Sequence, residues 1–402
     1  MMSATPLAGI RVLEFSHAVM GPTAGLIMAE MGAEVIKIEP VPGGDPTRRL
    51  GGFAAGFFAA LNRNKKSIAI DLKQAEGQAA LHKIAATADI VLENYAPGTM
   101  DRLNCGYDNL SGINPRLIYL ALKGYLKGPY EHRPALDEVV QFQSGLAYMT
   151  GPPGQPLRAG ASIIDILGAS FGVNAAQAAL HERETTGKGQ RVSSALFESA
   201  AFLMSIPMAG IAATGKEPPP MPARHGAWAI YDVFKTAEEG ELFIGVTSDQ
   251  QWERFSEEFG LRELASDPRL TSNVTRLAER SWLLPAVQEE LIKYPQKEVE
   301  QRCERANVSW SPVGKPVDLF TDEHLLETGG LLDVFVSRFG DEEGRFAGLP
   351  ALPFEFGANR ERPTLRNQPP KIGEHSEEVL SEAGLSATEI ANLNERKIVV
   401  SA

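Results

Sequence analysis

Cysteine is almost absent from this sequence, and its scarcity argues against a domain stabilised by disulfides or by a cluster of metal-binding cysteines. Only Cys105 and Cys303 occur among 402 residues, and they lie far apart along the chain. Two cysteines at this separation cannot form a disulfide framework, and no group of His, Cys, Asp and Glu has the spacing of metal ligands. We therefore expect two reduced thiols, no bound metal and a cytoplasmic protein.

Positive charge is also scarce. The chain has 39 Lys and Arg against 51 Asp and Glu, a formal net charge of −12. This excludes broad nucleic-acid binding, although a local basic pocket can still hold an anionic ligand. The opening Met-Met-Ser-Ala-Thr-Pro lacks the features of a signal peptide. The most membrane-like stretch, residues 200–214, is too short to span and contains Ser205 and Pro207, so we predict a buried helix and no membrane partner.

Several catalytic motifs are missing. The first β-α turn has no Gly-x-Gly-x-x-Gly, and Gly21-Pro22-x-x-Gly25 is a poor substitute, so a dinucleotide cofactor is disfavoured. No Gly-x-Ser-x-Gly is present, which argues against a serine hydrolase. Cys105 has no local base partner and is interpreted as structural. These absences leave no sign of a tightly bound cofactor.

What the sequence does contain is an alternation of strands and helices in its amino-terminal half. Such alternation is typical of a doubly wound α/β fold with a parallel, Rossmann-like sheet. Strands are predicted at residues 10–15, 34–39, 66–72, 89–93, 117–122 and 190–194. Helices are predicted at residues 23–31, 76–87, 109–112, 169–184 and 196–214.

The composition and the pattern of predicted elements change after about residue 215. Pro218-Pro-Pro220 resembles a linker. A hairpin over residues 228–236 and 241–247, then helical patterns at 249–259 and 283–306, predict a smaller α+β domain at about 224–313. A strand near 331–338 and a helix near 376–382 follow it.

Asp165 is the most informative residue. It lies inside an apolar run, shortly before Gly168 and the helical pattern. An acid at a loop-to-helix junction faces the backbone N–H groups of the helix start. Asp165 then either caps the helix or attacks an activated acyl group and carries it as a mixed anhydride.

Three other groups are candidates for chemistry. His17 follows the first strand, at the edge where open α/β sheets bind ligands, and is either a binding residue or a core histidine. Asp137 and Glu138 are adjacent and point different ways, so at most one meets Asp165 or a substrate. Basic residues near strand ends suit phosphates or form a solvated face: Arg48, Arg49, Arg63, Lys65, Lys66, Lys73 and Arg102.

Taken together, these segments resemble the class III CoA-transferases, the family of formyl-CoA transferase and carnitine CoA-transferase. The resemblance covers nearly the whole chain. It includes Met31-Gly-Ala-Glu-Val-Ile-Lys-Ile-Glu39 and Ala88-Asp-Ile-Val-Leu-Glu-Asn-Tyr-Ala-Pro-Gly98. The other matching segments are residues 7–22, 44–48, 64–73, 114–118, 184–190 and 373–380.

The resemblance implies an enzyme that moves CoA from an acyl-CoA donor to a carboxylic acid, with Asp165 as the covalent nucleophile. It also implies that acyl-CoA is contacted by His17, Ala18, Ile70, Lys73, Asn94, Tyr95 and Arg102. For the fold, it implies a homodimer of two chains interlocked like rings. Each chain then has a large domain built from residues 1–214 and 330–402 and a small domain at 224–313.

This chain departs from the family pattern at two places. Formyl-CoA transferase has a basic residue after the second strand, where this chain has Pro40, so Arg48, Arg49 or Arg63 is left to supply the charge. The glycine-rich loop that shields intermediates in that enzyme has no counterpart, since residues 218–226 carry prolines, Arg224 and His225.

A sister group with the same fold, the 2-methylacyl-CoA racemases, is the alternative. Its base is a histidine directly before an aspartate, where this chain has Leu136 before Asp137. Leucine cannot abstract a proton, which favours the transferase. Four basic residues are candidates to meet the far carboxylate of a dicarboxylic acid, and each is otherwise a surface residue or a contact of the CoA phosphates: Arg133, Arg158, Arg224 and His225. Asp137 is a further candidate substrate residue.

Overall fold

The computed structural model describes residues 5–223, 226–337 and 343–401. The chain divides into two compact units. The larger combines residues 1–151, 155–217 and 320–402, and the smaller combines residues 152–154 and 218–319. Both ends of the sequence therefore belong to the larger unit. The predicted residues Arg224 and His225 lie outside the described residues.

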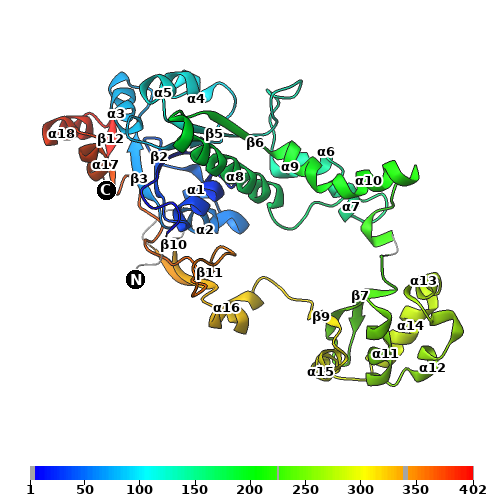
Figure 1. The fold of residues 1–402 in the computed structure, drawn as a ribbon. Helices are drawn as coiled ribbons and strands as arrows, with labels where there is room; N and C mark the ends of the chain where they lie inside the picture. The colour runs from blue at the N-terminus through cyan, green and yellow to red at the C-terminus, as the bar shows by residue number, and fades with distance from the viewer. Residues whose placement is uncertain (1–4, 224–225, 338–342, 402) are drawn as a thin grey trace. The chain divides into compact units, whose positions relative to one another are not determined.

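The larger unit is built on a seven-stranded sheet with the order β12-β3-β2-β1-β4-β5-β6 (Figure 1). Six strands are parallel, and only β12 is antiparallel to its neighbour. The order reverses at β1, which lies between β2 and β4. In such sheets, ligands bind beyond the carboxyl ends of the strands at the reversal point. The strands are β1 (Arg11–Phe15), β2 (Glu34–Glu39), β3 (Lys66–Ile70), β4 (Ile90–Glu93), β5 (Ile118–Lys123), β6 (Arg191–Ala195) and β12 (Val399–Val400).

Helices cover both faces of this sheet, as expected for parallel strands whose side chains are apolar on both sides. One core packs the sheet against α3 (Ala75–Ala85), α5 (Tyr107–Ile113), α17 (Ser376–Glu382) and α18 (Ala387–Glu395). The other packs it against α1 (Met20–Glu30), α6 (Asp137–Gln143), α8 (Ile163–Thr186) and α9 (Leu196–Leu203). The mixed α/β fold with a large parallel sheet is thereby confirmed.

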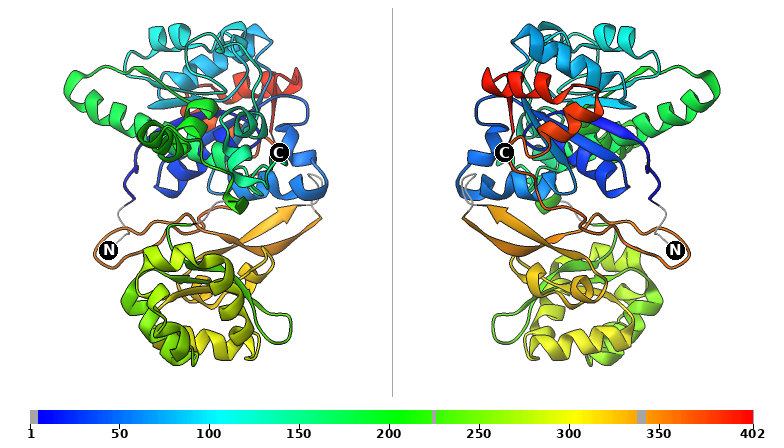
Figure 2. Two further views of the ribbon diagram at one scale, coloured as in Figure 1. Left: turned by 90° about the vertical axis from the view of Figure 1, so that its right-hand side faces the viewer. Right: turned by 90° about the vertical axis from the view of Figure 1, so that its left-hand side faces the viewer.

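The carboxyl-terminal segment completes the amino-terminal sheet. Val399 pairs with Ile70 of β3, and the Ser376 hydroxyl donates to the carbonyl of Val400 at 2.7 Å. Both views in Figure 2 draw the red terminal helices against the strands of the first hundred residues. The chain ends are thus part of one folded layer.

The remaining elements of the larger unit are short. They are α2 (Phe57–Asn62), α4 (Thr99–Arg102), α7 (Leu146–Thr150), α10 (Ser205–Thr214), α16 (Glu323–Glu327) and the antiparallel pair β10 (Leu331–Ser337) and β11 (Gly344–Pro350).

The smaller unit has its own core. Its antiparallel sheet has the order β7 (Ile230–Lys235), β8 (Glu241–Val246) and β9 (Ser309–Pro312), and the predicted hairpin is β7–β8. The helices are α11 (Asp249–Glu258), α12 (Arg262–Ala265), α13 (Asn273–Ala278), α14 (Arg280–Leu291) and α15 (Gln296–Ala306). The single helix predicted for 283–306 is wrong, because the chain breaks between α14 and α15, just before Gln296, where Pro295 adopts an extended backbone.

The predicted buried helix at residues 200–214 is also wrong. It is two helices, α9 and α10, that meet at Met204, and α10 has no buried residue. Ile206 is 83% exposed and Met208 is 60% exposed. By length and composition, α8 is apolar enough to cross a membrane, and α9 with α10 forms a broken second candidate. In this fold α8 packs against β5, β6 and α1, which accounts for its apolar composition.

Candidate active site

Asp165 lies in the first turn of α8, because the helix begins at Ile163, earlier than the sequence pattern predicts. It does not cap the helix. The capping carboxylate is Asp137 on α6, which accepts the backbone N–H groups of Ile164 at 2.8 Å and Asp165 at 3.0 Å. The Asp165 carboxylate has no hydrogen bond or ion pair to any residue that the structure describes. Its position and its lack of a partner favour the nucleophile over the cap.

A buried hydrogen-bond chain holds this turn in place. Gln141 donates its side-chain N–H to Asp137, and its Oε1 accepts the backbone N–H of Ala159 at 2.9 Å. Asp137 and Gln141 are 4% and 0% exposed. These hydrogen bonds therefore fix the positions of α6, the loop before α8 and the start of α8 relative to one another.

The surroundings of Asp165 disfavour its charge. Burial, followed by the charges of Asp137 and Glu138, raises the pKa of Asp165 to about 7. Of the two predicted acids, Asp137 contacts the backbone of Asp165, whereas Glu138 points to Arg158, with 3.3 Å between Glu138 Oε1 and Arg158 Nη1. A carboxylate that sits half-protonated near neutral pH, beside a helix start, is typical of catalytic sites.

The packing of two helices brings this turn close to the reversal point of the sheet. Gly168, one turn after Asp165, lies close to α1, because a Cβ there would lie 2.6 Å from the terminal methyl of Met20 and would displace it. Met20 begins α1, directly after the loop from β1 that carries His17 and Ala18. The close packing of α1 on α8 thus brings the end of β1 next to the start of the candidate site.

A cavity of about 310 Å³ opens at this reversal point. Four of the predicted CoA-contacting residues line it: His17, Ile70, Lys73 and Tyr95. The His17 and Tyr95 rings stack with centroids 5.5 Å apart, and burial lowers the pKa of His17, so the ring is neutral at pH 7. A mainly apolar cavity with stacked rings suits a planar ligand, and Lys73 is the one lysine or arginine among the described residues that line it, beside Glu39, Asp45 and Asp71.

The other three predicted residues border this region. Asn94 accepts the backbone N–H of His17 at 3.1 Å and donates to its carbonyl at 2.9 Å, so it fixes the loop after β1. Ala18 has a positive φ of 63°, which turns the chain sharply there. Arg102 lies on the exposed short helix α4 and donates to the Thr99 hydroxyl at 2.9 Å.

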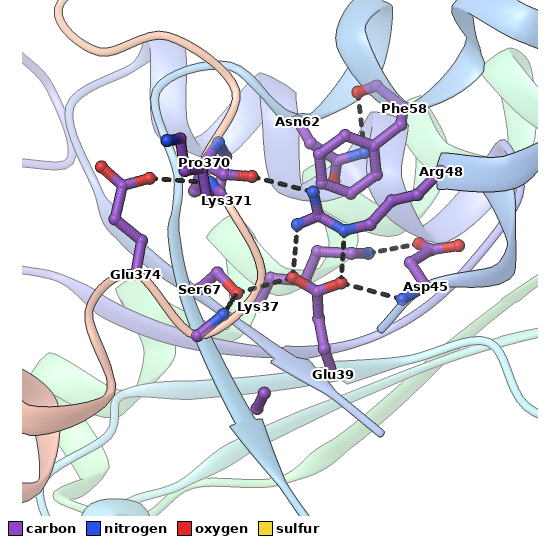
Figure 3. A network of polar contacts seen from close by, with 12 residues as sticks. Lys37, Glu39, Asp45, Arg48, Phe58, Asn62, Ser67, Pro370, Lys371 and Glu374 are labelled. Carbon is purple, nitrogen blue, oxygen red and sulfur yellow. Dashed lines mark hydrogen bonds and ion pairs between the residues drawn. The ribbon is translucent and has the colours of Figure 1, made fainter. Parts of the chain in front are cut away.

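One wall of the cavity rests on a buried ion network that the sequence did not predict (Figure 3). Glu39 accepts two hydrogen bonds from Arg48, one from Ser67 Oγ at 2.6 Å and one from the Asp45 backbone at 2.8 Å. Lys37 pairs with Asp45 at 2.9 Å. Because Glu39 and Asp45 also line the cavity, this network fixes the shape of its floor.

Glu14 forms the second half of the network, between Lys37 at 3.1 Å and Lys65 at 2.7 Å. Burial lowers the pKa of Lys65 to about 8 despite the attraction of Glu14. Gly25 on α1 makes room for this cluster, since a Cβ there would overlap the Glu14 carboxylate.

Most of the predicted basic set is therefore engaged inside the fold. Arg48 pairs with Glu39, Arg63 with Glu30, Lys65 with Glu14 and Lys66 with Glu34. Arg49 is exposed and donates to the carbonyl of Gly43. Of the three arginines left to supply the charge missing at Pro40, it is the one that forms no ion pair with any described residue. Arg133 stacks on Tyr130, with its guanidinium carbon 3.9 Å from the ring centroid.

Two expectations about alternative chemistry bear on the site. Leu136, at the position of the racemase histidine, is 66% exposed and offers only hydrocarbon. Within the described residues, no group of three or more His, Cys, Asp and Glu is arranged to hold a metal ion.

The sequence profile described as CoA-transferase family III matches residues 7–376 of this chain. The succinate–glutarate CoA-transferase of Agrobacterium fabrum is 32% identical over 94% of this chain and 95% of its own length. The acetyl-CoA:oxalate CoA-transferase of Acetobacter aceti is 35% identical, over 88% and 95% of the two chains. Among solved structures, a CAIB/BAIF family protein from Brucella suis superposes with a TM-score of 0.82 at 29% identity, covering 94% of this chain and 100% of its own.

Proposed function

Since this chain belongs to CoA-transferase family III and is an acyl-CoA:carboxylate CoA-transferase, we propose that Asp165 carries the transferred groups as covalent intermediates. The observation that carries this proposal is the unpaired carboxylate of Asp165 in the first turn of α8, held there by Asp137.

The exchange proceeds in two symmetrical halves. An Asp165 oxygen attacks the donor thioester carbonyl, and the C–S bond breaks. This step releases the CoA thiolate and forms a mixed anhydride between Asp165 and the donor acid. The thiolate attacks the Asp165 carbonyl of that anhydride, which releases the donor acid and leaves an aspartyl-CoA thioester. The acceptor carboxylate attacks this thioester and expels the thiolate, which then takes the new acyl group and frees Asp165. Each step exchanges one thioester or anhydride linkage for another, so no ATP is consumed.

The electrostatics of the site suit this chemistry. As a carboxylate, Asp165 is partly buried beside Asp137 and Glu138, which raises its pKa to about 7. Acylation makes the group neutral and so relieves both the desolvation and the repulsion between like charges. The N–H groups at the start of α8 are already taken by Asp137, and therefore they do not lower the reactivity of Asp165 by binding its oxygens.

We assign CoA binding to the cavity at the end of β1 and its border. His17, Ala18, Ile70, Asn94 and Tyr95 supply walls and turns, and Lys73 and Arg102 supply charge for the phosphates. CoA here is a substrate rather than a resident cofactor.

The substrate class follows from the relatives. The succinate–glutarate and acetyl-CoA:oxalate enzymes act, by their names, on dicarboxylic acids, as does the succinyl-CoA–L-malate CoA-transferase alpha subunit of Chloroflexus aurantiacus, which is 34% identical over 98% of this chain and 92% of its own. We infer that this enzyme also transfers CoA to a small dicarboxylic acid.

We also propose an interlocked homodimer in the cytoplasm. The exposed apolar side chains of α9 and α10, which include Phe202 and Ile206, support a partner copy because soluble proteins rarely leave such a patch uncovered. Two buried free thiols, Cys105 and Cys303, are consistent with a reducing compartment.

The test is to trap the intermediate. Wild-type enzyme incubated with an acyl-CoA and hydroxylamine should yield a hydroxamate on Asp165, seen by peptide mass spectrometry. Asp165→Ala should give neither the adduct nor transfer. Asp333→Ala, which removes an exposed carboxylate on β10, is the matched control. Full transfer by Asp165→Ala would refute the mechanism.

A further inference from the structure

Arg158 is the only basic residue in the sequence between Leu136 and Ile166, the stretch that contains α6, the loop before α8 and the first turn of α8. The other charged residues of that stretch are Asp137, Glu138 and Asp165. Of these, Asp137 and Glu138 are the charges that raise the pKa of Asp165, and Arg158 is the one cation that the stretch contains.

The backbone on both sides of Arg158 is fixed to the frame that holds Asp165. Leu157 donates its N–H to the carbonyl of Ala147 at 2.9 Å, and Ala159 donates to Gln141 Oε1 at 2.9 Å. Gln141 in turn donates to Asp137, which accepts the N–H of Asp165. The position of the Arg158 Cα relative to the nucleophile is thus set by an unbroken chain of hydrogen bonds.

The guanidinium of Arg158, by contrast, is only loosely held. Among the residues that the structure describes, its one ion pair is the 3.3 Å contact with Glu138, and the two side chains are 39% and 43% exposed. Exposed pairs of this kind contribute little to stability, about 0 to 1 kcal/mol. The guanidinium can therefore exchange Glu138 for another carboxylate at small cost.

We propose that Arg158 is the specificity residue for dicarboxylic acids, and that its guanidinium binds the far carboxylate of the acid while the near carboxylate reacts at Asp165. This rests on the proposed function of Asp165. In the free enzyme, the Glu138 carboxylate occupies the place that the far carboxylate of the acid takes on binding.

Charge explains why such a residue is needed. A dicarboxylate that approaches Asp165 meets Asp137 and Glu138 as well, and all of these repel it. A planar guanidinium donates two parallel hydrogen bonds to a carboxylate, and a monocarboxylic acid cannot accept them once its only carboxylate is reacting. Arg133 is a weaker candidate because its guanidinium is already stacked on Tyr130.

The experiment compares acids that differ only in the far carboxylate. Succinate and butyrate, and glutarate and pentanoate, serve as acceptors for wild type, Arg158→Gln and Arg158→Lys, with acetyl-, butyryl- and succinyl-CoA as donors. We expect Arg158→Gln to lose about tenfold to a hundredfold in kcat/KM for the diacids, mostly through KM, and to keep its rate with the monoacids. Arg158→Lys should recover part of the loss. Arg116→Gln, an exposed arginine whose acidic contact is Glu184 at 4.0 Å, is the control and should match wild type.

The outcomes separate this proposal from the proposed function. Unchanged diacid kinetics in Arg158→Gln, or equal use of diacids and monoacids by wild type, would overturn the role of Arg158 while an Asp165 adduct still forms. If wild type forms no Asp165 adduct with any donor, the covalent function itself fails. A wild type that rejects the monoacids altogether leaves the diacid KM of Arg158→Gln as the deciding measurement.

Discussion

The carboxylate of Asp137 accepts the backbone N–H of Asp165 at 3.0 Å, so one acid of the site caps the helix that carries the other. This arrangement separates two roles that a single aspartate would otherwise combine. Asp137 satisfies the helix start, and Asp165 stays free to react. The cost is repulsion between two nearby negative charges, which contributes to the raised pKa of Asp165.

Replacing Asp165 by Asn should stabilise the protein while it abolishes transfer. The pKa of Asp165 is about 7 in the folded chain against 3.8 as its ordinary value, so the folded state holds a proton that the unfolded state releases between these values. Stability from this group is therefore lost as pH rises from about 4 to 7, by up to about 4 kcal/mol. Urea unfolding should find Asp165→Asn more stable than wild type at pH 8 and nearly equal at pH 4.

The control for that measurement is Asp333→Asn, since Asp333 is exposed on β10. Its stability difference from wild type should be small at both pH values. If the gain in unfolding free energy of Asp165→Asn over wild type were no larger at pH 8 than at pH 4, the raised pKa assigned to Asp165 would be wrong.

Local sequence predicted the elements of the large sheet well because its strands are short apolar runs between helical patterns. Asp165 was also singled out from its neighbours, as a charge in an apolar run, and its role as nucleophile stays a prediction. The sequence did not predict that Asp137 caps the helix, because Asp137 and Asp165 are 28 positions apart and only the packing of α6 on α8 joins them. The exposure of α10 escaped prediction for a related reason, since an apolar helix that awaits a partner has the same composition as one in a core.

The basic residues illustrate the same limit. Charge and position near strand ends favoured phosphate contacts for Arg48 and Arg63 equally with Lys73. In the fold, the two arginines pair with Glu39 and Glu30, while Lys73 lines the cavity. Which cation is neutralised depends on acids supplied by other strands and helices, which sequence spacing alone does not reveal.

Replacing Glu138 by Gln should shift the pH dependence of transfer. Attack requires ionised Asp165, so the wild-type rate should rise with pH through about 7. Glu138 is one of the two charges that raise this pKa, and its removal should move the acid limb of kcat/KM to lower pH. Glu131→Gln, on the loop before α6, is a comparison that should leave the limb in place. An unchanged limb in Glu138→Gln would contradict the electrostatic account of Asp165.

Replacing Lys73 by Gln should weaken the binding of acyl-CoA without affecting the acid. Lys73 borders the cavity at the end of β1, and its ammonium group makes no ion pair within the described residues. Loss of one phosphate contact should raise KM for acyl-CoA about tenfold and make it less sensitive to salt, with KM for the acid unchanged. Lys83→Gln, which removes an exposed lysine 3.5 Å from Glu389, should behave like wild type. A rise in KM for the acid instead would place Lys73 at a different subsite.

The racemase alternative makes an opposite prediction about hydrogen exchange. A racemase must remove the α-proton of 2-methylacyl-CoA, which requires a base at the position of Leu136, and leucine has none. His132 lies four residues earlier on the exposed surface, and within the described residues it makes no hydrogen bond or ion pair with Asp165. Wild-type enzyme in deuterated water should therefore give 2-methylacyl-CoA without deuterium at the α-carbon, under conditions in which CoA transfer to an added acid is complete. Rapid α-deuteration that survives Asp165→Ala would assign a different base and reverse the choice between the two reactions.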